Sequence, residues 1–219
     1  NYLASWCLRY AAEQVITLQK EGITKEETQQ WLHIAQNIYF PYSEKYGVYL
    51  QQDGFLDKDL KPVSAIPAGE RPLNQHWSWD RILRSPYIKQ ADTLQGFYFF
   101  EDHFTKEELQ RHYEFYEPFT VHESSLSPCV HSVLASALGK TDEAYTLYLR
   151  TARLDLDDYN KEVHEGLHIT SMAGTWLSIV EGFAGMRVKN GKLHFTPRLP
   201  KHWKSLSFKA VSYTHLTLP

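Results

Sequence analysis

Three segments of the sequence combine side chains that can bind sugars or anions. The first spans residues 74–80, Asn-Gln-His-Trp-Ser-Trp-Asp, and is followed by Lys89 and Gln90. Aromatic rings beside amides and carboxylates suit sugars, because the C–H faces of a sugar stack on rings while its hydroxyl groups need directed partners. A loop anchored by two half-buried Trp side chains explains residues 74–80 equally well. Alone, Lys89-Gln90 reads as a solvated helical pair, but Lys89 falls on the apolar face of a predicted helix, where an unpaired ammonium group is costly.

The second segment, residues 120–128, reads Thr-Val-His-Glu-Ser-Ser-Leu-Ser-Pro and directly precedes a predicted helix. Hydroxyl groups and free backbone N–H groups at such a place can hold an anion. Spacing alone favours a simpler interpretation, in which a serine caps the helix.

The third segment, residues 164–176, contains two His four residues apart, with Glu165 next to the first of them. This spacing leaves a zinc site made by His164, Glu165 and His168 open. Gly166 lies between these ligands and no third ligand stands out, so we expect no metal. His168 precedes a helix start rich in small residues, where it is better suited to hold an anion.

Helices must position all three segments, because helical periodicity dominates the chain up to residue 182. The predicted helices cover residues 2–20, 24–40, 78–85, 88–98, 105–118, 126–138, 141–154 and 169–180. Residues 41–79 are expected to be irregular. Consecutive helices with long connections indicate an α/α toroid. In the first helix, the spacing predicts one buried face, made by Leu3, Cys7, Leu8, Ala11, Val15 and Leu18.

Short β runs follow the helices, at residues 186–188, 193–195 and 206–208. Asn190-Gly191 between the first two is a strong hairpin signal. The predicted fold is therefore mainly α with a small β module at its end.

Composition excludes several classes of protein. The chain has 219 residues, of which 42% are hydrophobic and 14% aromatic, and its net charge is −3. Disordered chains have fewer aromatic residues and a higher net charge, so this class is excluded. The slightly negative net charge argues against a nucleic-acid-binding protein, which would show a basic surface. No apolar run is long enough to span a membrane. We expect both cysteines, Cys7 and Cys129, to be buried thiols.

The three segments resemble the inverting disaccharide phosphorylases of glycoside hydrolase family 65. The resemblance extends from Asn1 to about Ala210, and the residues that carry it are 74–84, 88–92, 120–127 and 165–176. It implies the later helices of an (α/α)6 barrel over residues 1–182 and the start of a C-terminal β-sandwich over residues 183–210. We interpret Asn1 as a position inside a larger protein and residues 211–219 as a candidate non-native tail.

The resemblance also implies an activity. In this family inorganic phosphate attacks the anomeric carbon of a glucose while a Glu protonates the leaving oxygen, so that the α-linkage inverts to β-glucose 1-phosphate. That Glu is expected upstream of Asn1, so no catalytic residue is assigned here and the chain alone is expected to be inactive. The site residues implied are Lys89, Gln90, His122 and Glu123 for the sugars, and Ser124, Ser125 and His168 for phosphate.

Several further expectations follow from the resemblance. The form of residues 122–125 favours maltose as the disaccharide, with kojibiose, nigerose or trehalose as alternatives. A carbohydrate-binding toroid without catalytic activity is a further alternative. Phosphate is a co-substrate and no cofactor is expected. The intact enzyme is expected to be a cytoplasmic homodimer with neither nucleic-acid nor membrane partners.

Overall fold

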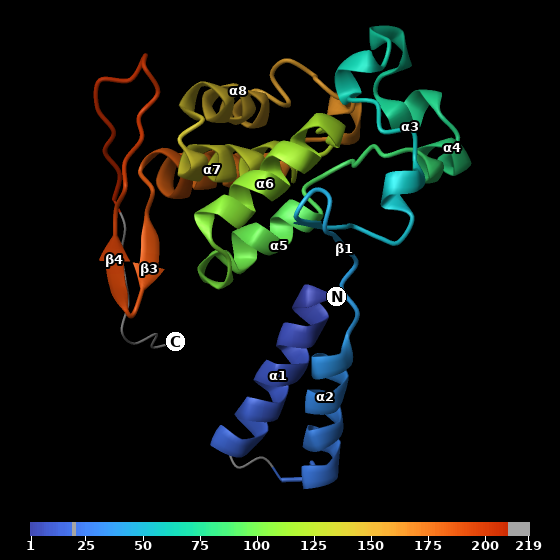
Figure 1. Cartoon of the computed structure of the whole chain (residues 1–219). Coiled ribbons are helices and arrows are strands. Elements are labelled where there is room, and N and C mark those ends of the chain that lie inside the picture. Colours follow the sequence, from blue (N-terminus) through green and yellow to red (C-terminus); the bar gives the residue numbers. More distant parts are fainter. Residues whose placement is uncertain (19–20, 210–219) are drawn as a thin grey trace. The chain divides into compact units, whose positions relative to one another are not determined.

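The computed structural model describes residues 1–18 and 21–209, and they form two compact units. The first unit comprises residues 1–88 and 92–120, and the second comprises residues 89–91 together with the chain from Val121 onward. Helices are the main elements of both units (Figure 1). Within the described residues, no helix combines the length and apolar character that crossing a bilayer requires.

The first unit begins with a pair of helices, α1 (Tyr2–Thr17) and α2 (Lys25–Asn37), which lie side by side (Figure 1). Later helices of this unit are α3 (Leu73–His76), α4 (Trp79–Arg84), α5 (Thr93–Phe99) and α6 (Lys106–Tyr116). Both α2 and α6 begin with a capping box, Thr24 with Glu27 and Thr105 with Glu108, in which each side chain bonds the other's backbone N–H. These caps satisfy backbone N–H donors that a helix start leaves without partners. The starts predicted for α2 and α6 are confirmed.

Residues 41–79 are largely irregular, as predicted, but they contain short elements that the pattern did not indicate. Strand β1 (Tyr42–Ser43) pairs with β2 (Val48–Tyr49) in an antiparallel hairpin. The single helical turns η1 (Phe55–Asp57), η2 (Val63–Ala65) and η3 (Ala68–Glu70) follow, and η4 (Glu101–His103) and η5 (Glu117–Phe119) flank α6. Each of these elements is too short to leave a period in the sequence.

The second unit is built around α7 (Pro128–Leu138). Every residue of α7 from Pro128 to Ser136 is buried, and the helix contacts α8 (Thr141–Ala152), α9 (Ile169–Leu177) and the π-helical turn η7 (Ser178–Phe183). Serine hydroxyl groups tie these helices together: Ser132 donates to the carbonyl of Ala144 at 2.8 Å, and Ser136 donates to that of Gly182 at 2.8 Å. A short turn, η6 (Val163–Glu165), precedes α9.

The β module at the end of the helices is confirmed for its first hairpin. Strands β3 (Arg187–Lys189) and β4 (Lys192–His194) pair antiparallel around Asn190-Gly191, both of which have positive φ angles, as such turns require. The third predicted β run is wrong, because residues 206–208 form no strand. The predicted tail at residues 211–219 lies outside the described residues, as does residue 210, the last of the predicted β domain.

The buried face predicted for α1 is only partly present, because Leu8, Ala11 and Val15 are half-buried and Leu18 is exposed. Leu3 is 53% exposed and Cys7 is also exposed, whereas Ser5 and Ala12 are buried. The Ser5 hydroxyl group donates to the carbonyl of Ala35 on α2 at 2.8 Å. The two helices therefore approach each other closely at Ser5 and Ala35, both of which are buried. The prediction for the second cysteine, Cys129, is confirmed, since it is buried.

The helix predicted over residues 88–98 starts later, at Thr93. The Ile88 N–H donates to the carbonyl of Phe119 at 2.9 Å, and Ile88 forms a parallel bridge with Thr120. This pairing holds Ile88 outside the helix, so Lys89 and Gln90 lie on a non-helical segment and both are exposed. The interpretation of Lys89 as part of an apolar helix face is therefore wrong.

Candidate functional site

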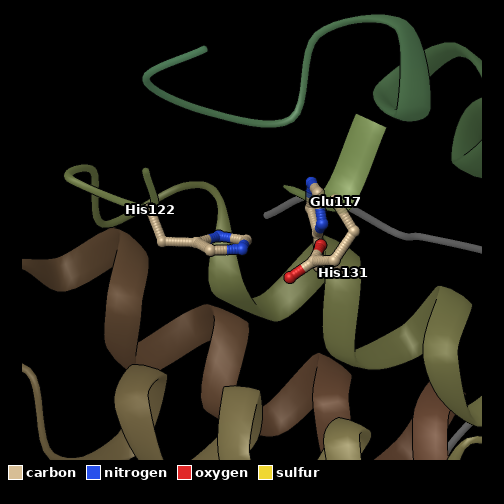
Figure 2. A group of neighbouring side chains, drawn as sticks. All are labelled: Glu117, His122 and His131. Carbon is tan, nitrogen blue, oxygen red and sulfur yellow. The ribbon is translucent and has the colours of Figure 1, made fainter. Parts of the chain in front are cut away.

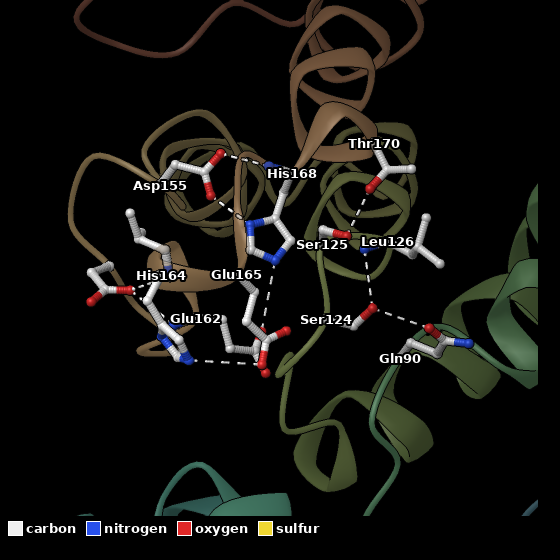
Figure 3. A network of polar contacts seen from close by, with 12 residues as sticks. Gln90, Ser124, Ser125, Leu126, Asp155, Glu162, His164, Glu165, His168 and Thr170 are labelled. Atoms are coloured by element: carbon white, nitrogen blue, oxygen red, sulfur yellow. Dashed lines mark hydrogen bonds and ion pairs between the residues drawn. The ribbon is translucent and has the colours of Figure 1, made fainter.

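Hydroxyl groups of the segment before α7 join two other parts of the second unit. Ser124 Oγ donates to Gln90 Oε1 at 3.1 Å and accepts a bond from the Leu126 N–H at 3.2 Å. Ser125 Oγ lies 2.7 Å from Thr170 Oγ1, in the first turn of α9 (Figure 3). Three segments that are far apart in sequence thus meet in one polar network. Ser124 and Ser125 are half-buried, so the network can reach solvent.

Thr170 is a member of this network that the sequence reasoning missed. It lies two residues after His168, within the segment that was already singled out. A threonine in the first turn of a helix is common, and only its bond to Ser125 marks it out.

His168 is held at the start of α9 by a carboxylate. Its Nδ1 lies 2.6 Å from Asp155 Oδ1, and its backbone N–H donates to Asp155 Oδ2 at 2.9 Å. The bond from that backbone N–H is the main reason that the pKa of Asp155 lies below its usual range, and the His168 ring adds to it. The other ring nitrogen, Nε2, lies 3.8 Å from Glu162 Oε2. Nδ1 is therefore engaged, and Nε2 is the ring atom that can meet a ligand.

The zinc alternative is not supported by the structure. His164 is largely exposed, and its Nε2 lies 3.9 Å from Glu165 Oε1, while His168 is engaged by Asp155. Among the described residues, His164, Glu165 and His168 do not form a group that could hold a metal ion.

His122 and Glu123, the two residues expected near the acceptor sugar, are buried. His122 Nδ1 lies 2.8 Å from Ser127 Oγ, and the His122 ring contacts that of His131 edge-on, with 4.6 Å between centroids. Figure 2 shows the side chains of His122 and His131. His122 has a positive φ of 55°, and Arg150 donates to its carbonyl at 2.9 Å. Residues other than glycine avoid this backbone region unless their surroundings hold them there.

The interpretation of residues 120–128 as a segment whose serine side chain caps the following helix is wrong. Ser127 is the N-cap residue of α7, but its side chain makes no capping bond to the helix. Its hydroxyl group is engaged with His122 instead.

The two tryptophans of the first segment differ in their surroundings. Trp77 Nε1 donates to Glu70 Oε2 at 2.6 Å, and the guanidinium group of Arg81 lies 3.5 Å from the centroid of the Trp77 ring. Trp79 is 68% exposed. The interpretation as a structural anchor therefore fits Trp77 and does not fit Trp79.

The first unit contains a cavity of about 520 Å³ that the sequence did not indicate. Aromatic and polar side chains line it, including Tyr39, Phe99, Gln51 and Asp92. Gln51 Nε2 donates to Asp92 Oδ2, so two of the lining side chains are held together. None of the residues predicted to bind sugar or phosphate lines this cavity.

Two family models match the chain. The model described as "Glycosyl hydrolase family 65 central catalytic domain" matches residues 1–177, and that described as "Glycosyl hydrolase family 65, C-terminal domain" matches residues 186–217. The chain belongs to glycosyl hydrolase family 65, and the resemblance seen in the sequence is confirmed. The predicted fold class, helices of the family's barrel followed by the beginning of its β domain, is confirmed with it.

Several relatives within the family are disaccharide phosphorylases by name. Maltose phosphorylase of Bacillus subtilis (strain 168) is 53% identical over 213 residues, which are 95% of this chain and 28% of that protein. Alpha,alpha-trehalose phosphorylase of Thermoanaerobacter brockii is 44% identical over 220 residues, also 95% of this chain and 28% of that protein. A solved structure described as a putative kojibiose phosphorylase from the human microbiome matches with a TM-score of 0.81 and 36% identity, over 91% of this chain and 28% of that one. The chain thus spans little more than a quarter of the length of these relatives.

Proposed function

We propose that this chain supplies the phosphate-binding residues and part of the sugar-binding residues of a disaccharide phosphorylase that acts on maltose. The observation that carries the proposal is the network in the second unit, in which Ser124 and Ser125 join Gln90 to the start of α9. Hydroxyl groups beside a helix start and an imidazole offer donors to an anion.

The proposed roles follow the network. Ser124, Ser125 and His168 bind phosphate, whose oxygens accept bonds from hydroxyl groups and from Nε2–H of the imidazole. Lys89 and Gln90 hold the glucose that is transferred. The bond from Ser124 to Gln90 supports this arrangement, because it joins the sugar-binding and phosphate-binding segments.

His122 and Glu123 are proposed to act on the acceptor side of the bond that is cleaved. Their burial within the second unit suits a role in fixing the shape of a subsite. The contact between His122 and Ser127 holds the backbone that leads into Ser124 and Ser125.

The reaction parallels inverting glycoside hydrolysis, with phosphate in place of water. A phosphate oxygen forms a bond to the anomeric carbon while the bond to the leaving oxygen breaks, and a carboxylic acid gives that oxygen its proton. We expect the acid to come from outside residues 1–219, so that the chain by itself is inactive. Phosphate is a co-substrate, and the proposed chemistry needs no cofactor.

Maltose is favoured over other disaccharides by the degree of similarity. Identity to the maltose phosphorylase is 53%, against 44% for the trehalose phosphorylase and 33% for a kojibiose phosphorylase of Halothermothrix orenii. We also propose that the intact enzyme is a cytoplasmic homodimer.

A chimaera tests the proposal. Residues 1–209 of this chain replace the matching segment of the Bacillus subtilis maltose phosphorylase, and the release of glucose and β-glucose 1-phosphate is measured with maltose, kojibiose, nigerose and trehalose. The expected result is phosphate-dependent cleavage, fastest with maltose. A folded chimaera that cleaves none of the four sugars would support the alternative of a carbohydrate-binding domain without activity.

Variants of the chimaera test the phosphate site separately. Ser124→Ala and Ser125→Ala are expected to raise the KM for phosphate about tenfold, since a lost hydrogen bond to a charged group typically weakens binding by that factor or more. Ser64→Ala, at an exposed serine outside the network, serves as the matched control. Equal KM values in all three variants would contradict the assignment. Phosphate-dependent cleavage by the isolated chain would contradict the expected position of the general acid.

A further inference from the structure

Asp155 binds His168 at two points. Its Oδ2 accepts the backbone N–H of His168 at 2.9 Å, and its Oδ1 lies 2.6 Å from His168 Nδ1 (Figure 3). Asp155 follows α8, and His168 is the N-cap residue of α9, so one carboxylate joins the end of one helix to the start of the next. The side chains of Asp155 and His168 are only 15% and 22% exposed.

The bond to the ring fixes the position of a proton. An ionised carboxylate can only accept hydrogen bonds, so Nδ1 of His168 must carry a hydrogen. Nε2 is then the ring atom that faces a ligand, and it donates to a phosphate oxygen when it carries a hydrogen as well. The second bond, from the backbone N–H of His168, holds the carboxylate in place beside the ring. A capping role for the start of α9 would need the backbone bond alone. The additional bond to the ring indicates a task for the imidazole itself.

We propose that Asp155 is a positioning residue for phosphate: it holds His168 with a hydrogen on Nδ1, so that Nε2 is presented to the anion. This inference rests on the proposed function, in which His168 binds phosphate. Asp155 does not contact the anion and acts through the imidazole. The same logic operates where a buried aspartate orients the histidine of a hydrolase and sets its tautomer.

Glu162 gives the proposal a second, opposite consequence. Its Oε2 lies 3.8 Å from His168 Nε2, on the side that phosphate would approach. A carboxylate beside Nε2 repels a second anion there. Removal of the charge at Glu162 should therefore tighten phosphate binding, whereas removal of the charge at Asp155 should weaken it.

The first measurement uses the full chain and the ¹⁵N shifts of histidine side chains, with the signals of His168 assigned from the His168→Gln variant. The wild-type chain is expected to show a His168 ring with a hydrogen fixed on Nδ1. Asp155→Asn is expected to move this hydrogen to Nε2 or to leave it exchanging between the two ring nitrogens. Asp157→Asn is the matched control, because Asp157 lies two residues away and pairs with Arg153 at 2.6 Å. An unchanged His168 ring in Asp155→Asn would overturn the proposal.

The second measurement is a titration with inorganic phosphate. Asp155→Asn is expected to weaken binding about tenfold, Asp155→Glu to recover part of the loss, and Glu162→Gln to tighten binding, while Asp157→Asn leaves it unchanged. Equal losses in Asp155→Asn and Asp157→Asn would indicate a general structural effect and would overturn the proposal. The KM for phosphate of the same variants in the chimaera gives an independent readout.

The two proposals fail in different ways. The proposed function would be refuted if the wild-type chain bound no phosphate and the chimaera showed no phosphate-dependent cleavage. The role of the His168 ring in phosphate binding would then fail with it. The ring shifts would still show whether Asp155 controls His168. Normal phosphate binding together with an insensitive ring would refute only the role of Asp155.

Discussion

Replacement of Gly174 by alanine is expected to push α9 away from α7. A Cβ atom built at Gly174 would lie 2.7 Å from the Cβ and 2.8 Å from the Sγ of Cys129, and 3.3 Å from Thr151 Cγ2. Carbon atoms pack at 3.5–4.0 Å, so the helices must separate by about 0.8 Å. Cys129 is buried and its Cβ is fixed to the backbone of α7, so it cannot move aside alone.

The magnitude follows from two opposing effects. Overpacking of this kind costs about 1–3 kcal/mol, while alanine favours a helix over glycine by about 1 kcal/mol. Gly96 supplies a matched control, because it lies within α5 and a Cβ atom there would meet nothing within 4 Å. Gly96→Ala should therefore stabilise the chain by about 0.5–1 kcal/mol. The difference between the two variants isolates the packing cost, about 1–3 kcal/mol, because the helix propensity cancels.

The assay is urea unfolding followed by circular dichroism, with hydrogen exchange of the α5 and α9 amides to assign the change to a helix. A shift of α9 should also disturb the bond from Ser125 to Thr170, since Thr170 is in the first turn of this helix. In the double variant Cys129→Gly/Gly174→Ala, the cost of the two changes should be less than the sum of the single changes. If Gly174→Ala proves as stabilising as Gly96→Ala, the packing argument is refuted.

Three further predictions concern two titratable side chains, Tyr116 and Asp155. The Tyr116 hydroxyl group donates to the Tyr49 carbonyl at 2.7 Å and accepts a bond from the Gln51 N–H at 2.9 Å. Tyr116→Phe should therefore lower the free energy of unfolding, measured in urea, by about 1–3 kcal/mol. A loss below about 0.5 kcal/mol would contradict this prediction. Burial raises the pKa of Tyr116 to about 12. The folded chain therefore keeps a proton that the unfolded chain loses above about pH 10. The wild type should accordingly lose stability between about pH 10 and pH 12 more steeply than Tyr116→Phe. The pKa of Asp155 is lowered by its bonds to His168, so its contribution is complete above about pH 4 and is lost as the pH falls through the lowered value. The stability difference between wild type and Asp155→Asn should accordingly shrink as the pH falls below about 4, and a constant difference would argue against the bond.

Local signals in the sequence predicted most of the helices and their ends. Thr24 and Thr105 begin α2 and α6 as expected, because a capping box acts within four residues. Asn190-Gly191 likewise places a hairpin by its own backbone preference. The run at residues 206–208 has suitable residues, but among the described residues it pairs with neither β3 nor β4, and a β run needs a partner to become a strand.

The family could also be identified from the sequence, because its motifs are short runs that keep their order. Lys89, Gln90, Ser124, Ser125 and His168 were all predicted as site residues on these motifs. The structure joins Gln90, Ser124 and Ser125 in one network, and it shows His168 held by a carboxylate. Their roles in binding stay predictions.

Only the tertiary structure decided which partners these side chains have. Asp155 carries no signal in the sequence, since an aspartate in a polar break is an ordinary residue, and nothing distinguishes Thr170 from its neighbours in the segment that was singled out. The buried residues of α1 could not be predicted either, because the periodicity of apolar residues does not show that Ser5 and Ala12 are buried or that Ser5 bonds the backbone of α2. Capping and turn preferences depend on a few neighbouring residues, whereas hydrogen bonds between distant segments and helix contacts through small side chains depend on how the whole chain packs.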